Sequence, residues 1–209
     1  MPRPLLEARG VAARLGEHRF PEVSLALESG DLVWVKGASG SGKSTLLRAL
    51  ARLVYSSGYI FFEGRAASHI PAPRWRRQVR YLGARPALGR GTVGDALARP
   101  FTFSSGEGAF DAEAARSELA TLGLEGLSMD AELHTLSSGQ LQRVALARAL
   151  LRPPAVLLAD ETCSHLDPEA TARVFRRLEG ALEVGTGIIW VSHRDEAPRA
   201  ARTVLELES

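Results

Sequence analysis

The stretch DLVWVKGASGSGKSTLLRALARL, residues 31–53, decides the fold class of this chain. It opens with a short apolar run at 31–37, passes through a glycine-rich turn and continues into TLLRALARL, whose apolar residues recur at helical spacing. A strand, a loop and a helix in this order form the first unit of an α/β sheet. We therefore expect an α/β fold built on a mainly parallel central sheet.

The turn inside this stretch fits the phosphate-loop pattern G-x-x-x-x-G-K-[ST]. Its glycines let backbone N–H groups curl around phosphate oxygens, Lys43 supplies a point charge to the β- and γ-phosphates, and the Ser44 hydroxyl is placed for Mg²⁺. A chance glycine-rich turn is the alternative, but the strand and the helix on either side favour a binding loop. The residues expected to bind nucleotide phosphates are Gly37, Ala38, Ser39, Gly40, Ser41, Gly42, Lys43, Ser44 and Thr45.

Two carboxylates follow a second apolar run. The segment AVLLADE, residues 155–161, is continuously apolar before Asp160 and Glu161, as expected of a central parallel strand. Because α/β sheets bind ligands at the carboxyl ends of their strands, we expect Asp160 to hold Mg²⁺ through water. Glu161 is a candidate for polarising an attacking water. The alternative is a strand that simply ends in solvent with two acids.

A second anion-binding segment lies much later in the chain, at LSSGQLQRVALARAL, residues 136–150. Small and flexible residues precede a run with apolar residues at helical spacing, and Arg143 and Arg148 are expected to face away from the core. The first backbone N–H groups of a helix lack partners inside the helix, so such a terminus binds anions. One small chain thus carries two candidate anion sites.

The remaining segments indicate a single domain, residues 1–209, with two additions to its core. The segments 4–15 and 22–28 alternate loosely and predict an antiparallel β edge, and 58–64 reads as a further strand. Glycine and proline punctuate 83–108, and a helix capped by Asp111 is expected over 111–124. We expect residues 1–84 and 154–209 to form the P-loop core with its β edge, and residues 85–153 to form an α-helical subdomain that carries LSSGQ.

Composition narrows the classes of function. The chain has 209 residues, a formal net charge of +2 and one cysteine, Cys163, which fits a reducing compartment. No apolar stretch is long enough to span a membrane. The arginines are scattered along the chain, so no nucleic-acid partner is expected. Lys36 and Lys43 are the only lysines among 26 basic residues, which suggests that Lys43 is required for its compact ammonium group.

Taken together, the phosphate loop, LSSGQ, ADE at 159–161 and VSH at 191–193 resemble the nucleotide-binding domain of ATP-binding cassette (ABC) proteins. The resemblance covers nearly the whole chain, and the order and spacing of the motifs are its most specific part. It implies that ATP and Mg²⁺ are bound, that Glu161 is the catalytic glutamate, and that His193 is the switch histidine at the γ-phosphate. Residues 136–140 would be the signature loop, and residues 164–167, SHLD, the D-loop.

In this family two cassettes meet head to tail, and each ATP lies between the phosphate loop of one copy and the signature loop of the other. The resemblance therefore implies a second cassette copy as partner, whose ATP is contacted by Ser137, Ser138, Gly139 and Gln140. It also implies the ATPase subunit of a membrane transporter, held at the cytoplasmic face of the cell membrane by a separate transmembrane permease. The short insertion and the tail look similar to small bacterial cassettes of metal- or iron-export systems.

Ser138 stands where the family usually has glycine and Cys163 where it usually has threonine, and two further departures from the family pattern bear on function. Ala84 stands where the family has a glutamine that reaches Mg²⁺ and senses the membrane partner, which puts coupling to a transporter in doubt. Leu15 stands where an aromatic side chain usually stacks on adenine, with His18 or Phe20 as alternatives, so base selectivity is expected to be weak.

Two other classes of function remain as alternatives. A non-transport ABC-type ATPase of DNA repair or translation, or a degenerate and weakly active cassette, is compatible with Ala84, although the long coiled-coil insertion of the repair members is missing. A P-loop kinase or a GTPase fits less well. GTPases read their base with an asparagine, which this chain lacks, and a small-molecule kinase has no use for LSSGQ or His193.

Overall fold

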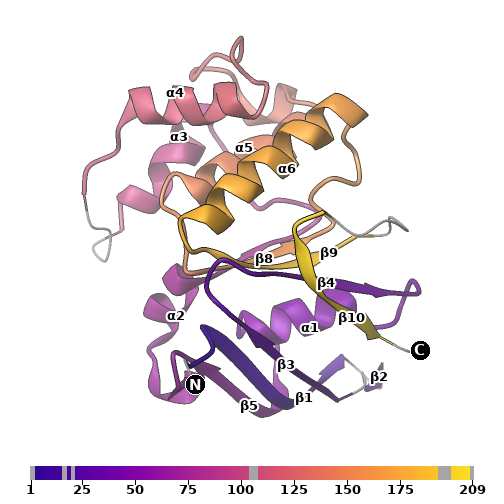
Figure 1. Cartoon of the computed structure of the whole chain (residues 1–209). Coiled ribbons are helices and arrows are strands. Elements are labelled where there is room, and N and C mark those ends of the chain that lie inside the picture. Colours follow the sequence, from indigo (N-terminus) through magenta and orange to yellow (C-terminus); the bar gives the residue numbers. More distant parts are fainter. Residues whose placement is uncertain (1–2, 16–17, 20–21, 104–107, 193–198, 208–209) are drawn as a thin grey trace. The chain divides into compact units, whose positions relative to one another are not determined.

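The computed structural model describes residues 3–15, 18–19, 22–103, 108–192 and 199–207, and Figure 1 shows its elements. The chain divides into two compact units. Unit 1 comprises residues 1–83, 154–161 and 181–209, and unit 2 comprises residues 84–153 and 162–180.

Unit 1 contains a sheet of five parallel strands, which confirms the predicted parallel sheet. Its strands follow the order β10-β4-β9-β8-β7, and every neighbouring pair is parallel. The strands are β4 (Leu32–Gly37), β7 (Val79–Leu82), β8 (Val156–Asp160), β9 (Gly187–Val191) and β10 (Ala201–Leu207). Both β8 and β9 are buried along their full length, as their continuous apolar sequences predict.

A second sheet of unit 1 is antiparallel and corresponds to the predicted β edge. Its long central strand, β1 (Leu6–Leu15), pairs with β2 (His18–Arg19), β3 (Val23–Leu27) and β5 (Ser56–Phe62), and β5 pairs with β6 (Arg65–Ala66). The register of β1 against both β3 and β5 shifts near Gly10, whose φ is +57°. At this shift the backbone of Gly58 approaches so closely that an added Cβ would meet the Gly10 carbonyl oxygen.

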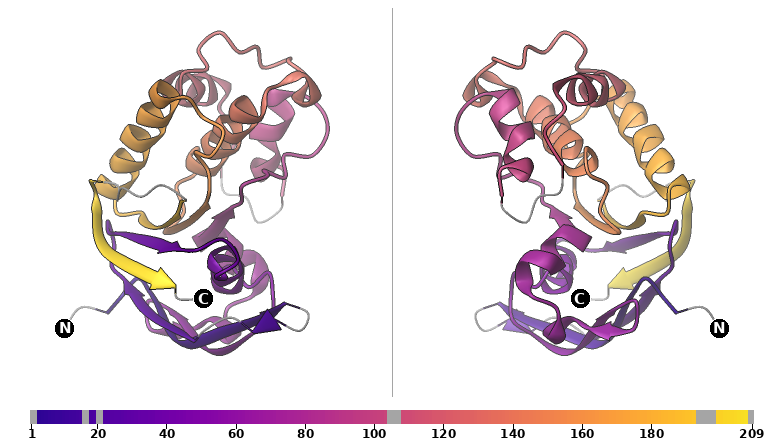
Figure 2. Two further views of the ribbon diagram at one scale, coloured as in Figure 1. Left: turned by 90° about the vertical axis from the view of Figure 1, so that its right-hand side faces the viewer. Right: turned by 90° about the vertical axis from the view of Figure 1, so that its left-hand side faces the viewer.

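The helix α1 (Lys43–Leu50) lies between the two sheets of unit 1 (Figures 1 and 2). Leu46, Leu47 and Leu50 of this helix belong to one apolar core together with residues of both sheets. The core also includes Trp75 of α2 (Ala72–Gln78), which follows the 3-10 helix η1 (Ala67–His69) and leads directly into β7. Because α1 is enclosed on both sides, its first turn and the loop before it are firmly supported.

All three tryptophans of the chain lie in unit 1 and are buried. Trp34 of β4 and Trp190 of β9 are register partners on adjacent parallel strands. Trp75 is fully buried, and its indole Nε1 donates to the Leu50 carbonyl oxygen at 3.1 Å.

Unit 2 is helical. Its helices are α3 (Val93–Ala98), α4 (Ala112–Thr121), α5 (Ser138–Leu150) and the first part of α6 (Pro168–Glu183), with 3-10 turns η2 (Arg99–Phe101) and η3 (Leu133–Thr135). Asp111 caps α4 as predicted, because its Oδ1 accepts from the backbone N–H groups of Glu113 and Ala114 at 2.8 and 3.1 Å. The helix α3 was not expected from the punctuated segment 83–108. Its capping box, formed by Thr92 and Asp95, is the sequence signal that was missed.

Residues 162–180 lie in unit 2, where the half-buried ion pair from Arg177 Nε to Glu118 Oε1, at 2.7 Å, joins α6 to α4. One expectation for unit 2 needs correction. Arg143 and Arg148 do not simply face solvent, because α3 and α4 both pack on α5. The guanidinium of Arg143 instead donates to the carbonyl oxygens of Leu122 and Gly123, which satisfies the carboxyl end of α4.

Candidate functional site

The predicted phosphate loop, residues 37–45, leaves the carboxyl end of β4 and enters α1. The first four residues of β4 are buried, and β4 pairs with both β9 and β10, so the loop starts from a fixed strand end. Gly42 is the N-cap of α1 with a φ of +97°, in the left-handed region that favours glycine. At Gly37 an added Cβ would lie 2.5 Å from the Leu207 carbonyl oxygen. The glycines of the pattern are therefore required by the backbone itself.

Two polar side chains of this loop are buried in ways that favour a bound anion. Lys43 is 5% exposed, and its Nζ donates to the carbonyl oxygens of Gly37 and Ala38 at 2.7 and 2.8 Å. An ammonium has three N–H groups, so one remains for a ligand. Ser41 is 4% exposed, and its Oγ has no hydrogen-bond partner within the described part of the chain. Because an unpaired buried hydroxyl is costly, a phosphate oxygen at this loop would stabilise it.

The carboxylate of Asp160 joins the phosphate loop to the strand β7. Asp160 ends β8 and is 1% exposed. Its Oδ1 accepts from the Ser44 hydroxyl at 2.9 Å, and its Oδ2 accepts from the Tyr81 hydroxyl at 2.7 Å. The Nε of Arg48 in turn donates to the Tyr81 oxygen at 3.2 Å. The structure thus brings together Ser44 and Asp160, the two residues that the sequence analysis names as magnesium ligands, and adds two residues that the sequence does not indicate.

The Ser44 and Asp160 side chains fit a magnesium ion. Both offer hard oxygen donors, and Mg²⁺ in nucleotide sites is held by one or two such groups together with phosphate oxygens and water. No group of three or more His, Cys, Asp or Glu side chains suited to a metal occurs among the described residues. Phosphate oxygens and water would complete the coordination of a Mg²⁺ ion held by Ser44 and Asp160.

Burial raises the pKa of Tyr81 to about 12, and the hydrogen bond to Asp160 adds to this rise. The folded protein therefore keeps this proton at pH values where the unfolded chain, with an ordinary tyrosine pKa of about 10, has lost it. The stability that the Tyr81 proton contributes is fully present below about pH 10 and is lost as the pH rises toward 12. At neutral pH the hydroxyl is a neutral hydrogen-bond donor.

We expect Tyr81→Phe to remove one phenolate titration step with a midpoint near pH 12. The step is measured as ultraviolet phenolate absorbance of the folded protein against pH. Tyr59→Phe is the matched control, because Tyr59 is 69% exposed on β5. A wild-type titration that contains no step above pH 11 would contradict the burial argument, provided that circular dichroism shows a folded protein at that pH.

Glu161 directly follows β8 and adopts an unusual backbone conformation. Its φ is +53°, although it is not glycine, and its backbone N–H donates to the Val191 carbonyl oxygen at 3.0 Å. A left-handed conformation costs a residue with a Cβ about 1–2 kcal/mol, and such strain tends to occur at functional sites. The pairing of β8 with β9 therefore holds this half-buried carboxylate beside Asp160 at a fixed strand end.

The predicted signature loop forms the amino end of α5. Ser137 is the N-cap: its Oγ accepts from the Gln140 backbone N–H at 3.2 Å, while Gln140 Oε1 accepts from the Ser137 backbone N–H at 2.9 Å. Since the Ser137 oxygen acts as an acceptor in this capping box, its own O–H proton stays available to an incoming anion. Ser137 and Ser138 are exposed and Gly139 is buried. An added Cβ at Gly139 would lie 3.0 Å from Leu166 and 3.1 Å from the His165 carbonyl oxygen, both in the predicted D-loop.

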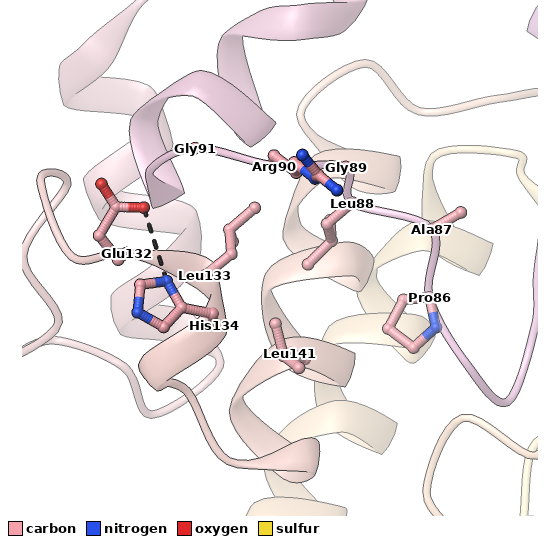
Figure 3. Close-up of a pocket in the computed structure, with 10 residues that line it drawn as sticks. All are labelled: Pro86, Ala87, Leu88, Gly89, Arg90, Gly91, Glu132, Leu133, His134 and Leu141. Carbon is pink, nitrogen blue, oxygen red and sulfur yellow. Dashed lines mark ion pairs between the residues drawn. The ribbon is translucent and has the colours of Figure 1, made fainter.

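Unit 2 also contains a pocket of about 590 Å³ (Figure 3). The first of its lining residues in the sequence is Pro86, which follows Ala84 closely. The pocket is lined by Pro86, Ala87, Leu88, Gly89, Arg90, Gly91, Glu132, Leu133, His134 and Leu141. Glu132 Oε2 and His134 Nδ1 lie 3.8 Å apart at one side of it, and Leu141 projects from α5 at another. Ala84 itself accepts a hydrogen bond at its carbonyl oxygen from Gln142 Nε2, at 3.1 Å.

The sequence model of one family, described as "ABC transporter", matches residues 20–164, which is more than half of the chain. The chain belongs to the ABC transporter family. The matched part is the ATPase domain of this family, so ATP is the nucleotide of the phosphate loop in this cassette.

Relatives of the cassette serve transporters of different kinds. A methionine import ATP-binding protein of Rhodococcus jostii is 34% identical over 214 residues, which are 96% of this chain and 62% of the relative. A pyoverdine export ATP-binding/permease protein of Pseudomonas aeruginosa is 32% identical over 97% of this chain and 32% of the relative. The chain thus spans less than two thirds of the length of both. The structure of a dimeric bacterial ABC transporter cassette matches 97% of this chain and 94% of that chain, with a TM-score of 0.85 and 25% identity.

The structure does not describe the side chains of four predicted site positions of the cassette. His193 and Phe20 lie outside the described residues, and only the backbone is described for Leu15, in β1, and His18, in β2. The switch histidine and the adenine-stacking position therefore stay predictions. Ser192, which precedes His193, directly follows the buried strand β9, as the sequence indicates.

Proposed function

We propose that this chain is the ATP-hydrolysing subunit of a membrane transporter, in which two cassette copies close over two ATP molecules and drive a separate permease. The contact between the Ser44 hydroxyl and the Asp160 carboxylate carries this proposal. It joins the phosphate loop to the carboxyl end of a central parallel strand, where a nucleotide and its metal bind in α/β sheets.

Different residues of unit 1 have different roles in ATP hydrolysis. Residues 37–45 bind the phosphates through backbone N–H groups, and Lys43 balances charge at the β- and γ-phosphates. Ser44 and Asp160 would hold Mg²⁺, which neutralises charge on the phosphates when it is bound. Glu161, fixed by its bond to Val191, polarises the attacking water and accepts its proton. His193 is proposed to donate to the γ-phosphate.

The signature loop of unit 2 completes the ATP site of a second copy. Ser137 and Ser138 are exposed at the amino end of a helix of 13 residues. Free N–H groups and the positive end of the helix dipole both attract a phosphate at this position. Residues 137–140 therefore contact the γ-phosphate of ATP bound to the partner, which explains why one chain has two anion-binding segments.

The permease is proposed to dock at the pocket of unit 2 that is lined by residues 86–91, and to hold the cassette at the cytoplasmic face of the membrane. The relatives named above are proteins of import and of export, so either direction of transport is compatible with this chain. Among the described residues, no helix is long and apolar enough to cross a membrane. Affinity capture from solubilised membranes should retain a multispanning protein; capture of ribosomes or DNA instead would favour the non-transport ATPase.

The composite site can be tested with Ser138→Glu. An acidic residue in the first turn of α5 suits the helix dipole and leaves the fold intact, but it repels the phosphates of the partner's ATP. We expect ATP hydrolysis to fall at least about 10-fold, whereas Ser138→Gln, the matched neutral control, retains most activity. Hydrolysis is measured as phosphate release by each purified variant.

Mixing two impaired variants separates a composite site from a site within one chain. Combining Ser138→Glu with Lys43→Ala creates mixed dimers in which one of two sites has an intact phosphate loop and an intact signature loop. If mixing is random, activity should recover to roughly a quarter of wild type, since half of the dimers are mixed. Mixed samples that stay as inactive as the separate variants would rule out composite sites in this chain.

A further inference from the structure

The environment of Asp160 goes beyond what the proposed function requires. A carboxylate that holds a metal through water needs one oxygen on the metal side, and the Ser44 hydroxyl occupies Oδ1 on that side. The other oxygen, Oδ2, accepts from the Tyr81 hydroxyl at 2.7 Å. Because Asp160 is only 1% exposed, water does not readily replace this donor.

Arg48 fixes the direction of this hydrogen bond. A guanidinium can only donate, so the Tyr81 oxygen must accept from Arg48 Nε, at 3.2 Å. The single proton of the Tyr81 hydroxyl is then directed to Asp160. The result is a series of two hydrogen bonds that are both donated in the direction of Asp160, from Arg48 of α1 to Tyr81 of β7 and from Tyr81 to Asp160 of β8.

The fold holds Arg48, Tyr81 and Asp160 at a fixed spacing. The strands β7 and β8 are parallel neighbours, and Tyr81 is the register partner of Leu158, two residues before Asp160. Arg48 lies on α1 one helical turn after Ser44, on the same face of the helix, so Ser44 reaches Asp160 directly and Arg48 reaches it through Tyr81. Both oxygens of Asp160 are thus set by groups of unit 1 alone.

We propose that Tyr81 is a positioning residue that orients Asp160 for the nucleotide-bound metal ion. This inference rests on the proposed function. Tyr81 acts through Asp160 and not directly on the metal or ATP; it holds Oδ2, so that Oδ1 faces Ser44 and can use its second lone pair to accept from metal-bound water.

The test is the metal affinity of Tyr81→Phe, which keeps the ring and removes the hydroxyl. The probe is Mn²⁺, whose free concentration is read by electron paramagnetic resonance in the presence of saturating ADP. Loss of a group that orients a metal ligand typically weakens metal binding about 10- to 100-fold. We expect the Mn²⁺ concentration that half-saturates the protein–ADP complex to rise about 10-fold, while ADP affinity in excess chelator stays within about 2-fold of wild type.

Tyr59→Phe is the matched control and should leave both affinities unchanged, since Tyr59 is exposed and stacks on Phe61 of the same strand. Unchanged Mn²⁺ affinity in folded Tyr81→Phe would overturn the inference, and so would an equal loss of ADP affinity with and without metal. Should Tyr81→Phe not fold, Arg48→Met decides: it frees the hydroxyl to rotate and should weaken Mn²⁺ binding, and no change overturns the role. A wild-type protein that binds no Mn²⁺ with ADP would contradict the proposed function itself.

Discussion

Glu161→Gln should reduce ATP hydrolysis at least about 100-fold while the protein still binds ATP and dimerises on it. A general base contributes about 10²- to 10⁴-fold to such a reaction, and the glutamine amide cannot accept the proton of the attacking water. Glutamate and glutamine have the same shape and the same difficulty in adopting the left-handed φ of +53° at this position. The substitution therefore changes the chemistry without changing the backbone.

The result is measured as phosphate release and as the molar mass in solution with and without Mg-ATP. Glu183→Gln is the matched control, because Glu183 is an exposed residue at the end of α6. We expect the Glu161 variant to accumulate as an ATP-bound dimer, since the closed state is no longer released by hydrolysis. A variant that keeps more than about a tenth of wild-type turnover would remove Glu161 from the role of general base.

Lys43→Ala should weaken ATP binding about 100-fold. Charge-assisted hydrogen bonds are the strong ones, and this ammonium is buried beside the carbonyl oxygens of Gly37 and Ala38 with no other lysine in the loop. Its removal leaves the phosphates without the compact charge that the loop is built around. Arginine is not expected to rescue binding, because its planar fork is larger than the space this 5% exposed side chain occupies.

The chain provides a natural control for this prediction. Its only other lysine, Lys36, precedes the loop directly and pairs with Glu206 at 2.9 Å on a partly exposed surface. Exposed ion pairs contribute little, so Lys36→Ala should bind ATP as the wild type does. Calorimetric titration with Mg-ATP measures both variants, and thermal unfolding shows that each is folded. Equal affinities for the two variants would contradict the role of Lys43.

The predictions from sequence succeed where the argument concerns strand ends. A glycine-rich turn after one apolar run and two acids after another put Ser44 and Asp160 at strand ends, and parallel strands end at the same edge of a sheet. The structure has this contact at 2.9 Å. The antiparallel edge and the Asp111 cap follow from alternation and from capping chemistry in the same way.

The features that the sequence does not predict depend on tertiary contacts, which leave no local signal in the sequence. Tyr81 contacts Asp160 only because β7 and β8 adopt a particular register, which the sequence does not encode as a motif. Arg143 was expected to face solvent because periodicity assumes one buried face, whereas α5 packs against α3 and α4 together. Residues 162–180 follow the core strand β8 in the chain yet group with unit 2, and the ion pair between Arg177 and Glu118 has no local sequence signal.

The placement of the tryptophans has a practical consequence for studies of this cassette. All three indoles are in unit 1, two of them side by side on β4 and β9, and unit 2 has none. Intrinsic tryptophan fluorescence therefore reports on unit 1 and not on unit 2. Melting of the helical half alone would be nearly silent in fluorescence yet would remove much of the far-ultraviolet ellipticity, so the two optical signals together report whether the halves unfold in one step.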